Sequence, residues 1–501
     1  MKLSSLTIND SIISLKLETN QMSLEKYFEP FRKNIVGIDL EHQGNKIIYA
    51  DWTASGRLYH PIENFMTNRV GPLVANTHTE ASFTGCTMTN LYHQAQQLIK
   101  KHLNANETDV LICAGAGMTS VVNKFQRILG LRVAEKWAGR FEISENEKPV
   151  VFITHMEHHS NQTTWEECAV TVVRIPEDSD GLPNANALNQ LLLEYKDRPL
   201  KIGSFTACSN VTGIKTDYKK LAKIMHQNDG YCFIDFAASA PYVDIDMHPQ
   251  DPLERLDAVM FSPHKFLGGP GSSGVLAFNK ELYSNKVPDH PGGGTVSWTN
   301  PWGKHHFFDD IEVREDGGTP GFLQTIRTAL SIKLKEQMGT ENIHLREKEL
   351  VDLLCEELSK VPSLEILHNQ HKNRLCVISF YVPDIHFNLI VRLLSDRFGI
   401  QTRGGCSCAG TYGHILLGVD QQTSDEITCQ IDEGDLSRKP GWVRVSMHPT
   451  STDAEAKFIA SSIAEVIENI REWETDYRFD SSIGDYLPIK EQELVLSLDD
   501  F

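Results

Sequence analysis

The feature that most constrains the fold of this 501-residue chain is a repeated alternation between short apolar runs and segments with helical spacing. Residues 109–113, DVLIC, lead into the glycine turn AGAGMTS, and the following VVNKFQRILGL has apolar residues at helical spacing. Short apolar strands separated by helices are typical of a mainly parallel α/β sheet. The other predicted strands of this sheet are residues 149–154, 201–207, 231–237 and 257–262.

The pattern changes after residue 330. There the sequence predicts a strand, an amphipathic helix, a second strand and a long final helix. In order, these are residues 374–382, 387–399, 441–447 and 451–473, the last capped by Ser451 or Thr452. We therefore predict a large domain over residues 46–330 and a smaller C-terminal α+β domain over residues 331–501. Residues 1–45 are expected to form an N-terminal arm, part of which packs on the small domain.

Two glycine-rich stretches are candidates for phosphate binding. Residues 269–274 form a literal G-x-G-x-x-G, but they lead into the apolar run VLAFN, whereas a dinucleotide-binding fingerprint follows a strand and opens a helix. Residues 115–119, GAGMT, do follow a strand and open a helix. Backbone N–H groups at such a helix start, together with the Thr119 hydroxyl, form an anion site. A tight turn capped by this threonine is the structural alternative.

Ser262, His264 and Lys265 directly follow a predicted strand, at the sheet edge where open α/β sheets bind ligands. The lysine amine can form an imine with a carbonyl cofactor, and the serine and histidine can hydrogen-bond a phosphate. Asp235 ends another predicted strand and is placed to keep a pyridine nitrogen protonated. Together these residue types favour pyridoxal 5'-phosphate as the cofactor.

Five motifs occur along the chain in a characteristic order: THMEHHSN, CSNVTG, IDFAAS, SPHKFLGG and RGGCSCAG. In this order they resemble the class V aminotransferase family, particularly SufS-type cysteine desulfurases and the desulfurase-like domain of molybdenum cofactor sulfurases. The resemblance covers residues 45–470. It implies a fold type I pyridoxal 5'-phosphate-dependent transferase that forms a homodimer with active sites at the subunit interface.

The resemblance implies roles for the residues around the cofactor. Lys265 would form the imine bond, Asp235 would pair with the pyridine nitrogen, and His158 would stack on the ring. Asn210 would lie near the ring hydroxyl and the substrate carboxylate. The phosphate would be held by Gly117, Met118, Thr119, Ser262, His264 and, from the other subunit, Thr319.

The resemblance also implies which residues bind and attack the substrate. Arg444 matches the arginine that binds the substrate α-carboxylate, a bidentate task suited to a guanidinium group. Arg403 would be a second anion contact. Cys408, rather than Cys406, occupies the position of the desulfurase nucleophile, although a pair of buried cysteines can also be inert.

The predicted function is that of a pyridoxal 5'-phosphate-dependent cysteine desulfurase-like enzyme, which produces alanine and a persulfide on Cys408. Lys265 would act as general base and His158 as a proton carrier. A sulfur-acceptor protein is an expected partner besides the substrate cysteine. The alternative is an aminotransferase, epimerase or lyase that uses the same cofactor on another amino acid.

Two features depart from the usual desulfurase pattern. Ala238 stands where desulfurases often have a glutamine that helps to hold the cofactor. An insert at residues 416–441 separates Cys408 from Arg444 and is expected to cover the active-site mouth or reshape the substrate pocket. Residues 297–310, SWTNPWGKHHFFDD, are expected to form a long polar and aromatic loop together with the EDGGTPG that follows at residues 315–321.

No metal site is predicted from the histidines and cysteines. His155, His158 and His159 lack H-E-x-x-H spacing, and the close pair Cys406 and Cys408 offers two thiolates where structural zinc needs four ligands.

Composition limits the partners and the compartment. The formal net charge of -19 argues against binding to nucleic acid or to an anionic membrane surface. The sequence has no apolar run long enough to cross a bilayer, and its start lacks the clean apolar core of a signal peptide. We therefore expect a cytoplasmic protein whose ten cysteines are free thiols.

Overall fold

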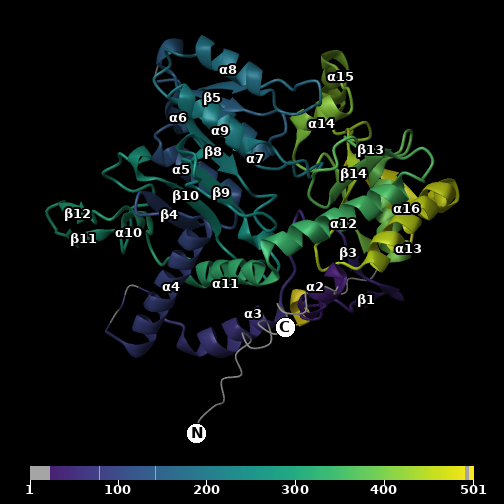
Figure 1. Cartoon of the computed structure of the whole chain (residues 1–501), viewed down its shortest axis with the longest axis horizontal. Helices are drawn as coiled ribbons and strands as arrows, with labels where there is room; N and C mark the ends of the chain where they lie inside the picture. Colours follow the sequence, from purple (N-terminus) through teal and green to yellow (C-terminus); the bar gives the residue numbers. More distant parts are fainter. Residues whose placement is uncertain (1–22, 78, 80, 141–142, 491–495, 501) are drawn as a thin grey trace, which may run out of the picture.

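The computed structural model describes residues 23–490 and 496–500, apart from residues 78, 80, 141 and 142. A seven-stranded sheet forms its centre, in the order β4-β10-β9-β8-β7-β5-β6 (Figure 1). The strands are β4 (Asp109–Ala114), β5 (Val150–Ile153), β6 (Thr171–Arg174), β7 (Lys201–Thr206), β8 (Tyr231–Asp235), β9 (Ala258–Phe261) and β10 (Gly274–Asn279). Strands β9, β8, β7, β5 and β6 pair in parallel, whereas β10 is antiparallel to both neighbours. The predicted mainly parallel α/β sheet is confirmed.

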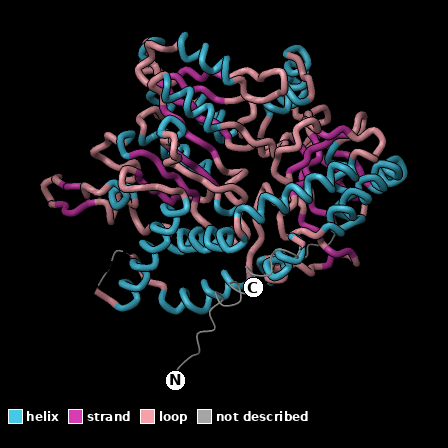
Figure 2. Tube along the Cα trace, in the orientation of Figure 1, coloured by secondary structure: helices cyan, strands magenta, loops and turns pink. Residues whose placement is uncertain are grey.

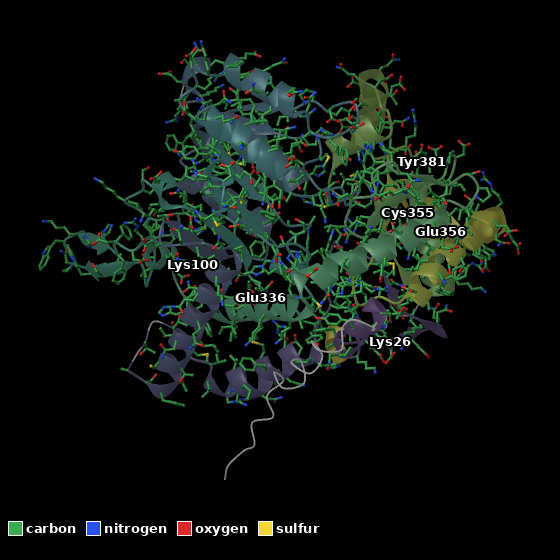
Figure 3. All side chains as sticks on the ribbon, viewed as in Figure 1. Lys26, Lys100, Glu336, Cys355, Glu356 and Tyr381 are labelled. Atoms are coloured by element: carbon green, nitrogen blue, oxygen red, sulfur yellow. The ribbon has the colours of Figure 1, made fainter. Side chains whose placement is uncertain are left out.

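Helices cover both faces of this sheet because successive strand side chains point to opposite faces. On one face, Val110 and Ile112 of β4 pack with α5 (Met118–Ile128) and α7 (His159–Glu166). On the other face, Leu111 and Cys113 pack with a second set of helices. These helices are α4 (Phe83–His102), α8 (Ala185–Glu194), α9 (Tyr218–Gln227) and α11 (Phe322–Met338). In Figure 3, Lys100 on α4 and Glu336 on α11 mark where these two helices run side by side.

A second, antiparallel sheet has the order β13-β14-β17-β16. Its strands are β13 (Glu365–Ile366), β14 (Val377–Tyr381), β16 (Arg403–Gly405) and β17 (Trp442–Ser446). It shares one apolar cluster with α12 (Thr340–Leu358), α13 (Phe387–Phe398) and α16 (Asp453–Trp473). Thr452 caps α16, because its side chain accepts the N–H of Glu455 and the Glu455 carboxylate accepts the N–H of Thr452. Of the two predicted caps, Thr452 is the observed one.

The first described residues lie against the C-terminal part of the chain. Helix α2 (Leu24–Arg32) contacts α12, and β3 (Ile48–Tyr49) pairs in parallel with β15 (Ile400–Gln401). Residues 1–22 of the predicted arm lie outside the described residues. The division at residue 330 stays a prediction. Helix α11 runs through this position to Met338, and Gly339 links it to α12.

The segment predicted as a loop at residues 297–310 contains two strands. Strands β11 (Val296–Thr299) and β12 (His305–Phe307) form an antiparallel hairpin that projects from the body of the protein at the left of Figure 2. The prediction of a loop throughout is therefore wrong. Aromatic and β-branched side chains favour extended backbone here, and Asn300 organises the turn by accepting the N–H groups of Trp302 and Lys304.

The insert at residues 416–441 contains one complete helix. Helix α14 (Gly410–Leu416) leads into it, and α15 (Gln421–Asp432) forms its middle. Its end contacts the hairpin of β18 (Tyr477–Asp480) and β19 (Asp485–Pro488), where the N–H of Leu436 donates to Ser481 O at 2.8 Å. The remaining elements include β1 (Glu41–His42), β2 (Asn45–Lys46), α3 (His60–Phe65), α6 (Glu135–Ala138) and α10 (Ile311–Glu315). None of the described helices is both long enough and apolar enough to cross a membrane.

Candidate active site

The carboxyl ends of β8 and β9 border a cavity of about 240 Å³, at the sheet edge where α/β proteins bind ligands. All of the predicted site residues except Gly117 and Thr319 line this cavity. They are Met118, Thr119, His158, Asn210, Asp235, Ser262, His264, Lys265, Arg403, Cys408 and Arg444. The fold thus brings together side chains from distant parts of the chain, while their individual roles stay predictions.

One end of the cavity is the start of α5. Gly117 precedes the helix, and the first helical residue, Met118, donates its N–H to Ser262 Oγ at 2.8 Å. A Cβ on Gly117 would lie 3.0 Å from both Ser262 Oγ and His264 Cε1, so glycine permits this close approach. Helix N–H groups beside a hydroxyl and an imidazole form an end of the cavity suited to an anion.

Lys265 and Asp235 are the ionisable pair of the cavity. Lys265 lies in the short turn after β9, and Asp235 is the last residue of β8. Burial lowers the pKa of Lys265 to about 8, while the Asp235 charge opposes this shift. Burial raises the pKa of Asp235 to about 6, opposed by the Ala237 N–H, which donates to Asp235 Oδ1 at 2.7 Å. The lowered pKa increases the neutral fraction of the amine, which is its nucleophilic form.

His158 lines the cavity from the start of α7. Its Nδ1 accepts the N–H of Ser160 at 3.1 Å, so a neutral ring carries its proton on Nε2. Burial, and then the charge of Lys265, lower the pKa of His158 to about 3. The ring is therefore neutral and held in one orientation, which suits a group that stacks on a cofactor. Within the described part of the chain, no three His, Cys, Asp or Glu residues are grouped to hold a metal ion.

Glu157, the residue before His158, was missed by the sequence analysis. Its buried carboxylate accepts the N–H of Thr206 at 3.0 Å, the hydroxyl of Thr154 at 2.7 Å and the amide of Asn161 at 2.7 Å. Burial raises the pKa of Glu157 to about 7, and the Asp235 charge adds to this shift. This carboxylate joins the ends of β5 and β7 beside the cavity. The only signal in the sequence was an acidic residue between the histidines of THMEHH.

Asp51 is a second residue that the sequence analysis missed. Arg403 and Arg444 lie directly opposite each other on β16 and β17, an arrangement that like charges disfavour. Asp51 accepts Arg444 Nη2 at 2.7 Å through Oδ1 and Arg403 Nε at 3.0 Å through Oδ2. Arg444 is buried, its Nη1 donates to Asn210 O at 3.0 Å, and its Nε has no partner. One carboxylate therefore holds both predicted anion-binding arginines.

The loop between β16 and α14 contains the two neighbouring cysteines. Cys408 is exposed and lines the cavity, whereas Cys406 packs against an apolar cluster that includes Trp442. Ser407 and Cys408 have φ values of 51° and 58°, in the left-handed region that non-glycine residues seldom adopt. Asn210 Nδ2 donates to Ser407 O at 2.7 Å and holds the loop beside the cavity.

Thr319 does not line the cavity that contains Lys265. It borders a neighbouring cavity of about 600 Å³ that shares Thr119 with the first. Its Oγ1 accepts an N–H of Asn76 at 3.3 Å. Ala238, in contrast, lines the first cavity, so the alanine that departs from the desulfurase pattern faces the predicted cofactor space.

The sequence of this chain is similar to those of one known family of proteins. The sequence model of the family described as aminotransferase class-V matches residues 48–458. A probable cysteine desulfurase of Staphylococcus epidermidis is 30% identical over 73% of this chain and 83% of its own length. A probable cysteine desulfurase of Staphylococcus aureus is 28% identical over 74% of this chain and 85% of its own length.

Two solved structures share the fold. A cysteine desulfurase from Thermococcus onnurineus NA1 aligns with a TM-score of 0.69 at 21% identity, covering 88% of this chain and 98% of that one. The cysteine desulfurase CsdA from Escherichia coli aligns with a TM-score of 0.68 at 19% identity, covering 90% of this chain and 99% of that one. At these identities, the likeness concerns the fold alone.

Proposed function

The chain belongs to the aminotransferase class-V family, and from this premise we propose that it is a pyridoxal 5'-phosphate-dependent, cysteine desulfurase-like enzyme. The observation that carries the proposal is the exposed Cys408 thiol beside the cavity that contains Lys265 and Asp235. Relatives named as probable cysteine desulfurases support it. Such an enzyme removes sulfur from cysteine and releases alanine.

The residues of the cavity fit the proposed cofactor. The amine of Lys265 would hold its aldehyde, and the start of α5 with Thr119, Ser262 and His264 would hold its phosphate. Asn210 Oδ1 is buried without a hydrogen-bond partner, as expected for a group that awaits a ligand. When bound, pyridoxal 5'-phosphate supplies an electron sink for the substrate α-carbon.

The protein side chains would then move protons and sulfur. Lys265, with its lowered pKa, would remove the α-proton as general base, and the neutral His158 would carry protons. The Cys408 thiolate would attack the substrate sulfur. An S–S bond forms as the Cβ–S bond breaks, and the electron pair of the broken bond stays on Cβ. Protonation of Cβ, together with return of a proton to the α-carbon, gives alanine. The product on the enzyme is a Cys408 persulfide.

The test of this function is incubation of the purified enzyme with cysteine, followed by measurement of alanine and sulfide. Equal amounts of alanine and released or enzyme-bound sulfur are expected. Turnover that requires a keto acid and yields no sulfur would instead indicate transamination. Ala238 is the feature that favours this alternative, since it lines the cavity at a position where desulfurases often have a glutamine.

We expect Asp51→Asn to weaken the binding of the substrate carboxylate. The substitution removes the charge that holds Arg444 and Arg403, so KM for cysteine should rise about tenfold, while kcat changes by less than about threefold. Steady-state kinetics measure both values. Asp39→Asn is the control, because Asp39 is exposed and pairs with Lys46 away from the cavity. An unchanged KM in Asp51→Asn would contradict the role given to this residue.

The proposal includes a homodimer with shared active sites. Its support is that Thr319 does not line the cavity that contains Lys265 in the same chain but borders a second cavity of that chain. Mixing inactive Lys265→Ala and Thr319→Glu proteins under exchange conditions should restore about a quarter of the activity, since about half of the dimers are hybrids with one intact site. Absence of recovery, despite hybrids detected by native mass spectrometry, would contradict shared sites.

A cytoplasmic location and a sulfur-accepting partner also belong to the proposal. All ten cysteines lie in the described part of the chain and are free thiols, which suits a reducing compartment. The exposure of Cys408 is consistent with transfer of its sulfur to an acceptor.

A further inference from the structure

His159 makes two contacts with the cysteine loop. Its backbone N–H donates to Cys408 O at 2.8 Å, and its ring Nε2 accepts the N–H of Gly410 at 2.9 Å. One residue therefore holds the chain on both sides of Ala409. The neighbouring side chain, His158, lines the cavity instead, so the two adjacent histidines serve different parts of the site.

The loop depends on such contacts because its backbone adopts an unfavourable conformation. Ser407 and Cys408 both have left-handed φ angles, which side chains with a Cβ disfavour. Backbone of this kind persists only where surrounding groups hold it. Within the loop, the N–H of Ala409 donates to Cys406 O at 3.0 Å. From outside it, the amide of Asn210 donates to Ser407 O, and His159 contacts Cys408 and Gly410.

The ring of His159 also accepts a backbone N–H at the start of α14, where no side chain caps the helix. Gly410 is the first residue of this helix, and the preceding Ala409 has no side chain that could cap it. A Cβ on Gly410 would lie 3.2 Å from His159 Nε2, so glycine leaves room for the ring. Burial and the charge of Lys439 lower the pKa of His159, against the opposing charge of Glu166, and this keeps Nε2 available as an acceptor.

We propose that His159 is a positioning residue that holds the Cys408 loop at the cavity, through its ring contact with Gly410 and its backbone contact with Cys408. Under the proposed function, this contact sets the position from which the thiolate attacks sulfur. Loss of the ring contact should therefore reduce the rate of sulfur transfer more than it reduces substrate binding.

The first experiment measures the backbone hydrogen exchange of the cysteine loop, and its outcome does not depend on the reaction. Hydrogen exchange of the cofactor-loaded protein is compared for wild type, His159→Leu and His159→Gln, with a peptide that covers residues 406–416. Leucine should raise exchange in this peptide about tenfold, because the partly buried hydrogen bond from the Gly410 N–H is lost. Glutamine should restore protection, since its amide oxygen can replace Nε2 as the acceptor. His344→Leu, on the exposed side of α12, is the matched control and should leave the peptide unchanged.

The second experiment measures persulfide formation by rapid quench with cysteine. The rate and kcat should fall about tenfold in His159→Leu, with KM within about twofold of wild type, and glutamine should recover most of the loss. Should the leucine variant fail to fold, His159→Asn replaces it, because its shorter amide does not reach Gly410. Unchanged exchange in a folded variant would overturn the inference. Absence of persulfide in the wild type would overturn the proposed function, and the exchange result would still decide the role of His159.

Discussion

Replacement of Lys265 by alanine is expected to lower turnover by about 10⁴-fold or more and to remove the visible absorption of the bound cofactor. The reason is that one amine serves two purposes in the proposed site. It would hold the cofactor aldehyde and then remove the substrate α-proton, and its pKa of about 8 suits both tasks. Absorption spectra and alanine release from cysteine measure the two losses separately.

The control for this experiment is Lys280→Ala, because Lys280 follows β10 and is exposed away from the cavity. It should retain both the spectrum and the activity. A Lys265→Ala protein with an unchanged spectrum and full activity would refute the assignment of this lysine, and with it the proposed cofactor site.

Replacement of Cys408 by alanine is expected to lower sulfur transfer from cysteine by about 10³-fold or more while the cofactor spectrum stays unchanged. The thiol is the proposed nucleophile, and cofactor binding does not use it. Alanine keeps the Cβ at the left-handed position of Cys408, so the backbone cost of that conformation is the same in both proteins. Rapid-quench measurement of enzyme-bound sulfur and mass spectrometry of the loop peptide test the prediction.

Cys406→Ala is a matched control in the same loop. Cys406 packs against the cluster of Trp442 and Tyr412, so its loss should affect stability slightly and sulfur transfer by less than about threefold. A persulfide found on Cys406 alone would reverse the assignment. Absence of persulfide on both cysteines, together with unaffected turnover of another amino acid in both variants, would favour the alternative aminotransferase, epimerase or lyase function.

Site residues that follow predicted strands were the easiest to identify from the sequence. Asp235 follows YCFI and Lys265 follows DAVMFS, and the structure has both beside one cavity. Asp51 follows the apolar run IIYA, which is the same signal, yet its two arginine partners lie 352 and 393 residues away in the chain. The apolar run therefore marks Asp51 as a residue at a strand end, but the sequence does not reveal its two arginine partners.

The cysteine loop shows a similar limit. The motif RGGCSCAG indicated a reactive cysteine, and the resemblance favoured Cys408, but neither reveals the left-handed backbone or the contacts of His159. The hairpin of β11 and β12 was missed for another reason. Its strands are short and exposed, so they lack the apolar run by which the buried strands were recognised.

The sequence by itself determined the alternation of strands and helices in the large sheet, the α/β class and the residue types of a pyridoxal phosphate site. Each of these depends on local spacing or on a residue next to a strand end. Tertiary structure alone decided that Cys408 lines the cavity while the partly buried Cys406 packs against an apolar cluster. It also decided that Asp51 joins two arginines and that His159 contacts the loop. These contacts join residues from distant segments, and their partners are chosen by the packing of whole elements, which no local pattern records.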